Sequence, residues 1–186
     1  IASWSQKAAW ADGNFGDIVV TPLTHLTVDV TDATTHMPLD AEIILVPTPA
    51  TSRDQVHGTE NGYFDRNCAP YLGAPHASAP ACNRALAYNG HTAMSLLPGN
   101  YWVYATAGPS RTIARQQVSL TEGADGHATL ALTALPGIYP DGSLAADFHV
   151  HSGRSFDITL PANDRVETFI TSGIDVIAAT EHDVVG

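Results

Sequence analysis

Short stretches rich in apolar residues, several of which alternate with polar ones, recur along the first three quarters of the chain. The clearest begins at Leu26, where Leu26, Val28 and Val30 are separated by polar residues. This period of two places one face of a β-strand against a core. Aromatic and β-branched residues favour strands in the same way. The other strands predicted on these grounds cover residues 41–47, 101–105, 111–120 and 127–133.

Turn signals separate these stretches, including Pro98-Gly99-Asn100 and the glycine-containing run 122–126. Several short strands divided by turns, without a helical period, predict a β-sandwich. We assign this domain to residues 1–136, with a long insertion over residues 50–92. The segment 137–143 is dense in Pro and Gly and is predicted to be a linker.

The second predicted domain, residues 144–186, has a different pattern. Its first stretch, 144–150, is predicted to be a strand, and residues 174–179 form a nearly continuous apolar stretch, typical of a strand buried in a parallel sheet. Between them, three residues share one face of a helix: Val166, Phe169 and Ile170. This order predicts a β-α-β unit that opens an α/β domain.

Histidines follow both predicted strands of this unit. His149 and His151 are two residues apart, so they lie on one face of the first strand, and His182 follows the second. A right-handed crossover brings those two strand ends to the same side, where Asp157 can also reach. We therefore predict a metal site at His149, His151, Asp157 and His182. Three carboxylates are further candidates, either as ligands or as acceptors that orient the imidazoles: Asp147, Glu181 and Asp183.

The remaining polar residues receive weaker assignments. Arg154 is a candidate contact for an anionic substrate or an ordinary surface arginine. Six histidines outside the strand ends are expected to be structural or surface residues: His25, His36, His57, His76, His91 and His127.

Three segments of the sequence resemble the start of a PHP domain, the polymerase and histidinol phosphatase family. They are DFHVHS at 147–152, SFD at 155–157 and SGIDVIAATEHD at 172–183. Glu181 stands where an aspartate is commoner in that family, a variation that resembles the carbaryl-hydrolase-type branch. The fold class expected is thus a β-sandwich followed by the first β-α-β unit of a PHP-type (β/α)7 barrel.

The resemblance implies two or three divalent ions, Zn, Mn or Fe. His149 and His151 would bind one ion, and Asp157 and His182 a second. Such ions would activate water to hydrolyse a phosphoester, or a related ester or carbamate, of a small molecule. The catalytic group would be this water, with no side chain assigned. Because the remaining ligands would lie beyond Gly186, we expect the rest of the barrel as a continuing or separate polypeptide, and this chain alone to be inactive.

The first domain resembles the carboxypeptidase regulatory-like, or transthyretin-like, β-sandwich. The resemblance rests on residues 28–45 and, more clearly, on LPGNYWV at 97–103. Such modules often position an enzyme or bind a surface. The alternative function is therefore a β-sandwich accessory or binding module without catalytic activity of its own.

Composition excludes several partners. The net charge is −11 with eight Lys and Arg residues, which argues against binding nucleic acid or an anionic membrane surface. No apolar run approaches the roughly twenty residues that span a bilayer, so no membrane insertion is expected.

Two cysteines, Cys68 and Cys82, lie in the proline-rich insertion. A disulfide that closes this loop is favoured over two reduced thiols, and a metal site over these cysteines is the weakest alternative. The disulfide would imply export to the periplasm or the extracellular space. Since the sequence starts at Ile1, we expect that a leader or a longer N-terminal part has been removed.

Overall fold

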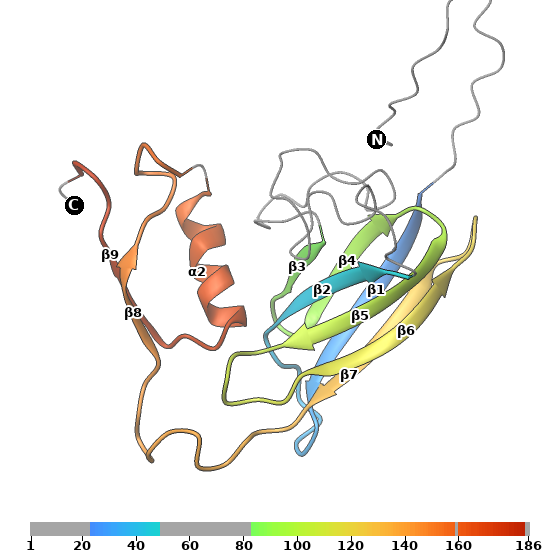
Figure 1. Ribbon diagram of the computed structural model, residues 1–186, viewed down its shortest axis with the longest axis horizontal. Coiled ribbons are helices and arrows are strands. Elements are labelled where there is room, and N and C mark those ends of the chain that lie inside the picture. The colour runs from blue at the N-terminus through green and yellow to red at the C-terminus, as the bar shows by residue number, and fades with distance from the viewer. Residues whose placement is uncertain (1–22, 49–82, 159, 185–186) are drawn as a thin grey trace, which may run out of the picture.

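The computed structural model describes residues 23–48, 83–158 and 160–184 (Figure 1). Two sheets form most of it, one of three strands in the order β4-β1-β7 and one of four in the order β3-β2-β5-β6. Strand β1 runs antiparallel to β4 and parallel to β7, and the four-stranded sheet is antiparallel throughout. The strands of these two sheets are β1 (Thr24–Asp32), β2 (Ala41–Pro47), β3 (Arg84–Ala87), β4 (His91–Leu96), β5 (Gly99–Thr106), β6 (Ala114–Leu120) and β7 (Gly126–Leu132).

The two sheets enclose a single apolar core. Leu26 and Val28 of β1 belong to this core together with Ile43 and Leu45 of β2, and all four side chains are fully buried. Burial of one such side chain contributes about 1.5–3 kcal/mol. The alternation that predicted the first strand therefore marks the core face of the three-stranded sheet.

The turn after β1 is fixed by the side chain of Asp32. Its carboxylate accepts hydrogen bonds from the backbone N–H groups of Thr34 and Thr35, each at 2.9 Å, and an ion pair from Arg111. These contacts hold the pKa of Asp32 well below its usual range. The largest effect comes from the N–H of Thr35, followed by the Arg111 guanidinium and the N–H of Thr34. An aspartate at this position thus closes the turn between the two sheets.

A smaller unit follows the sandwich. It consists of β8 (Ala146–Val150), α2 (Ala162–Thr171) and β9 (Val176–Ala179), in which β8 and β9 form a parallel pair. Figure 1 shows α2 between this pair and the sandwich, where the helix contacts β2 and β3. Gly173 ends the helix with φ of +72°, a conformation that glycine adopts without steric cost.

The end of α2 lies directly against the sandwich. A Cβ atom added to Gly173 would come within 2.7 Å of the carbonyl oxygen of Ala107, in the segment after β5. Only a residue without a side chain permits this approach of two backbones. The glycine therefore serves both the end of the helix and its contact with the sandwich.

The fold class expected from the sequence is wrong as a whole assignment. The two packed sheets agree with the sandwich half of it, but the described residues contain the single helix α2 and only a two-stranded parallel pair after the sandwich, so they form no barrel. Strand β9 is also not buried on both faces, because Val176 and Ala179 are exposed. A short apolar run has the same pattern in a barrel and in an isolated pair, so the pattern could not separate the two.

The predicted insertion, residues 50–92, extends too far at its C-terminal end. Strand β3 and the start of β4 lie within the expected 50–92 segment, and neither was predicted. The domain division at residues 137–143 stays a prediction. Cys68 and Cys82, and hence the expected disulfide, lie outside the described residues.

Candidate metal centre

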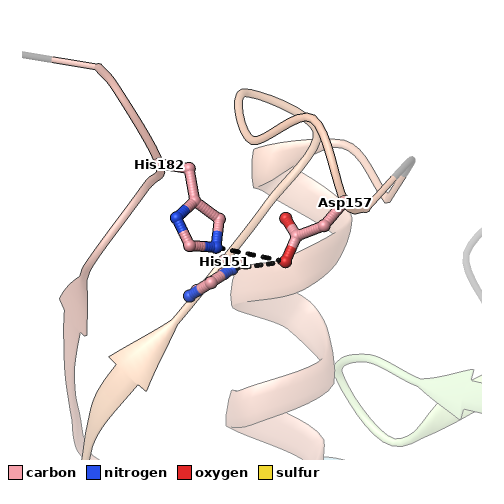
Figure 2. A group of neighbouring side chains, drawn as sticks. All are labelled: His151, Asp157 and His182. Atoms are coloured by element: carbon pink, nitrogen blue, oxygen red, sulfur yellow. Dashed lines mark hydrogen bonds and ion pairs between the residues drawn. The ribbon is translucent and has the colours of Figure 1, made fainter.

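Side chains that can bind metal meet where β8 and β9 end (Figure 2). His151 directly follows β8, His182 comes three residues after the end of β9, and Asp157 lies in the loop between β8 and α2. One ligand atom of each residue lies within 4.8 Å of the others. Three segments of the chain thus contribute to one group of possible ligands.

Asp157 is at the centre of this group. Its Oδ2 atom lies 2.9 Å from Nδ1 of His151 and 3.4 Å from Nε2 of His182. The rings of the two histidines meet edge to face, with centroids 4.4 Å apart. His151 is half-buried, whereas Asp157 and His182 are exposed, so an ion could reach the group from solvent.

His149 lies beside this group rather than within it. Its Nε2 atom is 3.1 Å from Nε2 of His151, whose Nδ1 atom is the one that faces Asp157. His151 therefore joins His149 on one side to Asp157 and His182 on the other. The division of these four residues between two ions, which the resemblance implied, stays a prediction.

The spacing of these atoms suits a metal ion. Ligands bound at about 2.0–2.2 Å lie roughly 3.0–3.5 Å from one another around an ion. The distance of 3.4 Å between His182 and Asp157 falls in this range, and that of 2.9 Å between His151 and Asp157 lies just below it. Imidazole nitrogen and carboxylate oxygen together suit Zn, Mn or Fe. The residues present thus fit a divalent ion.

The charge of Asp157 favours the same ligand role. Desolvation raises the pKa of its carboxyl group, but the hydrogen bond from His151, the local backbone N–H and the charges of His151 and His182 outweigh this effect and lower it. The group is therefore an anion at neutral pH, as a metal ligand must be.

Glu181, a candidate either as a ligand or as an acceptor that orients an imidazole, is hydrogen-bonded to two serines. Its carboxylate accepts hydrogen bonds from the backbone N–H and hydroxyl of Ser152 and from the hydroxyl of Ser155. These bonds, led by the one from the Ser152 hydroxyl, lower the pKa of Glu181 to about 2. Neither serine was predicted to belong to the site, although both lie in the segments that resemble the PHP family, DFHVHS and SFD.

The other candidates lie outside the group of three possible ligands. Asp147 accepts a hydrogen bond from the backbone N–H of His149 at 2.9 Å, and with His149, His151 and Asp157 it lines a cavity of about 330 Å³. Asp183 is exposed and has φ of +54° in the turn after His182. Arg154 is likewise exposed.

Three of the six histidines assigned to the surface or to structural roles lie on the outer face of the three-stranded sheet. Two of them, His91 and His127, contact the same carboxylate, Asp29, at 2.7 and 3.0 Å. The third, His25, lies 3.2 Å from the hydroxyl of Ser95. His36 lies in the turn after β1, and His57 and His76 fall outside the described residues.

Comparison with known proteins identifies no family. No family model and no curated protein matches the chain. Solved structures that resemble it include the minor pilin of Streptococcus agalactiae, at 14% identity and a TM-score of 0.42, over 67% of this chain and 50% of that one. The major pilin of Bacillus cereus matches at 13% identity and a TM-score of 0.37, over 60% and 30% of the two chains. A shaft pilin of Lactobacillus rhamnosus GG matches at 14% identity and 0.37, over 63% and 49%. The chain thus spans half or less of the structures named here.

These findings correct the family and activity expected from the sequence. The chain was expected to be a PHP-type metallohydrolase with a carboxypeptidase regulatory-like sandwich, but neither resemblance is matched by a family model, and the structures named above are pilin subunits. The assignments as hydrolase, phosphoesterase and enzyme are corrected accordingly. The small-molecule ester substrate, which depended on them, is not tested by these findings. The three segments that resemble the PHP family were too short to determine the rest of the domain. Among the described residues, no helix is long and apolar enough to cross a membrane.

Proposed function

We propose that this chain is a β-sandwich accessory module without catalytic activity of its own, and that it binds a divalent metal ion through His151, Asp157 and His182. The observation that carries the proposal is the approach of these three ligands to within 4.8 Å from three separate segments. The role of the ion is structural: it links the end of β8, the loop before α2 and the end of β9.

The small β8-α2-β9 unit has a physical need for such a link. Within β8 only Val150 is buried, and in β9 no residue is fully buried. A parallel pair with so little buried apolar surface contributes little stability from packing. A bound metal that ties both strand ends together offsets this weakness, as metals do in other small units.

The size of the effect follows from linkage. An ion that binds only the folded chain stabilises it by about 2.7 kcal/mol when its free concentration is 100 times the dissociation constant. The unfolded chain has its ligands far apart and gains little. Metal should therefore raise the midpoint of thermal unfolding of this unit.

The test is calorimetric titration of the 186-residue chain with ZnCl2, together with thermal unfolding with and without the metal. We expect saturable binding and a higher unfolding midpoint in the wild type. Both effects should be lost in the double variant His151→Ala/His182→Ala and kept in His25→Ala, an exposed histidine of the sandwich. Absence of binding in the wild type, or equal binding in the double variant, would overturn the proposal.

We also propose that another polypeptide pairs with the β8–β9 sheet. Among the described residues no strand pairs with the outer edge of β8 or of β9. Leu144, two residues before β8, and Phe148, within β8, are 68% and 71% exposed, which is unusual for a parallel sheet. Light scattering of the purified chain, alone and mixed with extract from its source, tests this partner: a monomer that captures nothing contradicts it.

Export to the periplasm or the extracellular space is proposed on Cys68 and Cys82 alone. The two cysteines lie in one proline-rich segment, and paired cysteines are commonest in exported proteins. Fractionation of the source cells tests this directly, and recovery of the protein from the cytoplasm alone would contradict it.

A further inference from the structure

Three hydrogen bonds converge on the carboxylate of Glu181. The backbone N–H of Ser152 donates to Oε2 at 2.9 Å, the hydroxyl of Ser155 donates to the same oxygen at 2.6 Å, and the hydroxyl of Ser152 donates to Oε1. Both serines are buried, with exposed fractions of 3% and 4%. A carboxylate that accepts several charge-assisted bonds from buried donors is held in one orientation.

This network extends to the ligands on both sides. The Ser155 hydroxyl oxygen also accepts the backbone N–H of His182 at 2.9 Å, and the N–H of Ser155 donates to the carbonyl of Ser152 at 2.8 Å. Asp157 follows two residues after Ser155. The segment that carries Asp157 and the segment that carries His182 are therefore joined through the same serine.

We propose that Glu181 is a positioning residue of the metal centre, which sets the separation of Asp157 and His182 by clamping Ser152 and Ser155. This inference rests on the metal binding proposed above. Glu181 lies outside the group of three possible ligands, and its carboxylate is directed to the three donors of the two serines. Residues that hold ligands in place in this way typically change metal affinity by about 10–100-fold when they are removed.

The competing explanation is that the hydrogen bonds of Glu181 only hold the two strand ends together, without positioning the ligands. The chain offers a matched control for this explanation. The hydroxyl of Thr180 accepts the N–H of Val150 at 3.0 Å and donates to the carbonyl of Val150 at 3.2 Å. It therefore links the same strand ends as Glu181 without touching the serines. Thr180→Val removes this tie and leaves the clamp in place.

The experiment titrates CoCl2 into the full chain, because the visible spectrum of bound Co2+ reports on the geometry of its ligands. We compare the wild type with Glu181→Ala, Glu181→Gln, Ser155→Ala and Thr180→Val. Affinity should fall about 10–100-fold in Glu181→Ala and Ser155→Ala, with an altered spectrum. The Co2+ affinity of Glu181→Gln should lie between that of the two alanine variants and that of the wild type. The amide has one acceptor oxygen and retains part of the hydrogen-bond network. Thr180→Val should bind Co2+ with an affinity within about threefold of the wild type and with the same spectrum, because the hydrogen bonds between Glu181 and the two serines are intact.

The outcomes separate this inference from the proposed function. If the wild type binds no Co2+, both fail. If the wild type binds and Glu181→Ala binds with the same affinity and spectrum, only the positioning role fails. Equal losses in Thr180→Val and Glu181→Ala would also overturn it, since cohesion of the strands would then explain both. Should Glu181→Ala not fold, as judged by circular dichroism without metal, Glu181→Gln and Ser155→Ala decide the question in the same way.

Discussion

The Nε2 atoms of His149 and His151 lie 3.1 Å apart at the end of β8. Two neutral imidazoles at this distance share one proton in a hydrogen bond, or both turn their lone pairs toward one cation. The other nitrogen of His151 faces Asp157 at 2.9 Å. His151 thus lies between His149 and Asp157 and connects His149 to the group of three possible ligands.

This central position predicts unequal effects of the two histidines. His151→Ala should abolish Zn2+ binding, whereas His149→Ala, which lies outside the group of three ligands, should weaken it by no more than about tenfold. Calorimetric titration of both variants measures the difference. An equal loss in the two variants would mean that His149 is itself an essential ligand.

The sandwich core predicts a contrast between two neighbouring isoleucines of β2. Ile43 is 0% exposed, whereas Ile44 points to the other face and is half-buried. Ile43→Ala should lower the free energy of unfolding by about 2–5 kcal/mol, because it removes buried surface and leaves a cavity. Ile44→Ala should cost clearly less. Denaturant unfolding of both variants provides the comparison, and equal losses would contradict the assignment of the faces of β2.

Asp32 predicts a dependence of stability on pH. Its pKa is lowered in the folded chain from an ordinary value of 3.8, so the unfolded chain binds the proton more tightly. The stability that Asp32 contributes is therefore complete above about pH 4 and is lost as the pH falls toward the folded pKa. Asp32→Asn should be less stable than the wild type at pH 6, and the gap should narrow below pH 4. A constant difference between pH 6 and pH 2 would contradict this account.

A comparison of Gly173 with Gly137 tests how much the close contact between α2 and the sandwich contributes to the free energy of unfolding. Both have positive φ, of +72° and +77°, but a Cβ at Gly137 would have nothing within 4 Å, whereas one at Gly173 would meet the backbone of Ala107. Either change to alanine should cost about 1 kcal/mol of backbone strain. Only Gly173→Ala should add the cost of separating the helix from the sandwich. Thermal unfolding of the two variants distinguishes them, and similar midpoints would show that this close contact contributes little.

Local patterns in the sequence were sufficient for several strands and for the grouping of ligands. Alternation identified β1, and the order of strand, helix and strand brought His151 and His182 to the same end of a parallel pair. Strand β3 was missed although Asn89-Gly90, a strong hairpin signal, follows it, and both residues have positive φ.

Other features depend on what surrounds a segment. The clamp at Ser152 and Ser155 could not be predicted, because burial of a hydroxyl against Glu181 is a property of the folded loops. The barrel was an extrapolation from about forty residues to a whole domain. Apolar runs and paired histidines are compatible with a parallel pair of strands in many surroundings, so they do not determine what encloses that pair.

The most direct test of the account is the metal content of the chain after equilibrium dialysis against Zn2+, compared with that of His182→Ala. His182 is exposed and outside the core, so its replacement should leave the fold intact. We expect saturable Zn2+ binding by the wild type that His182→Ala loses. A wild type that retains no more Zn2+ than the variant would contradict the central claim that His151, Asp157 and His182 form a metal centre.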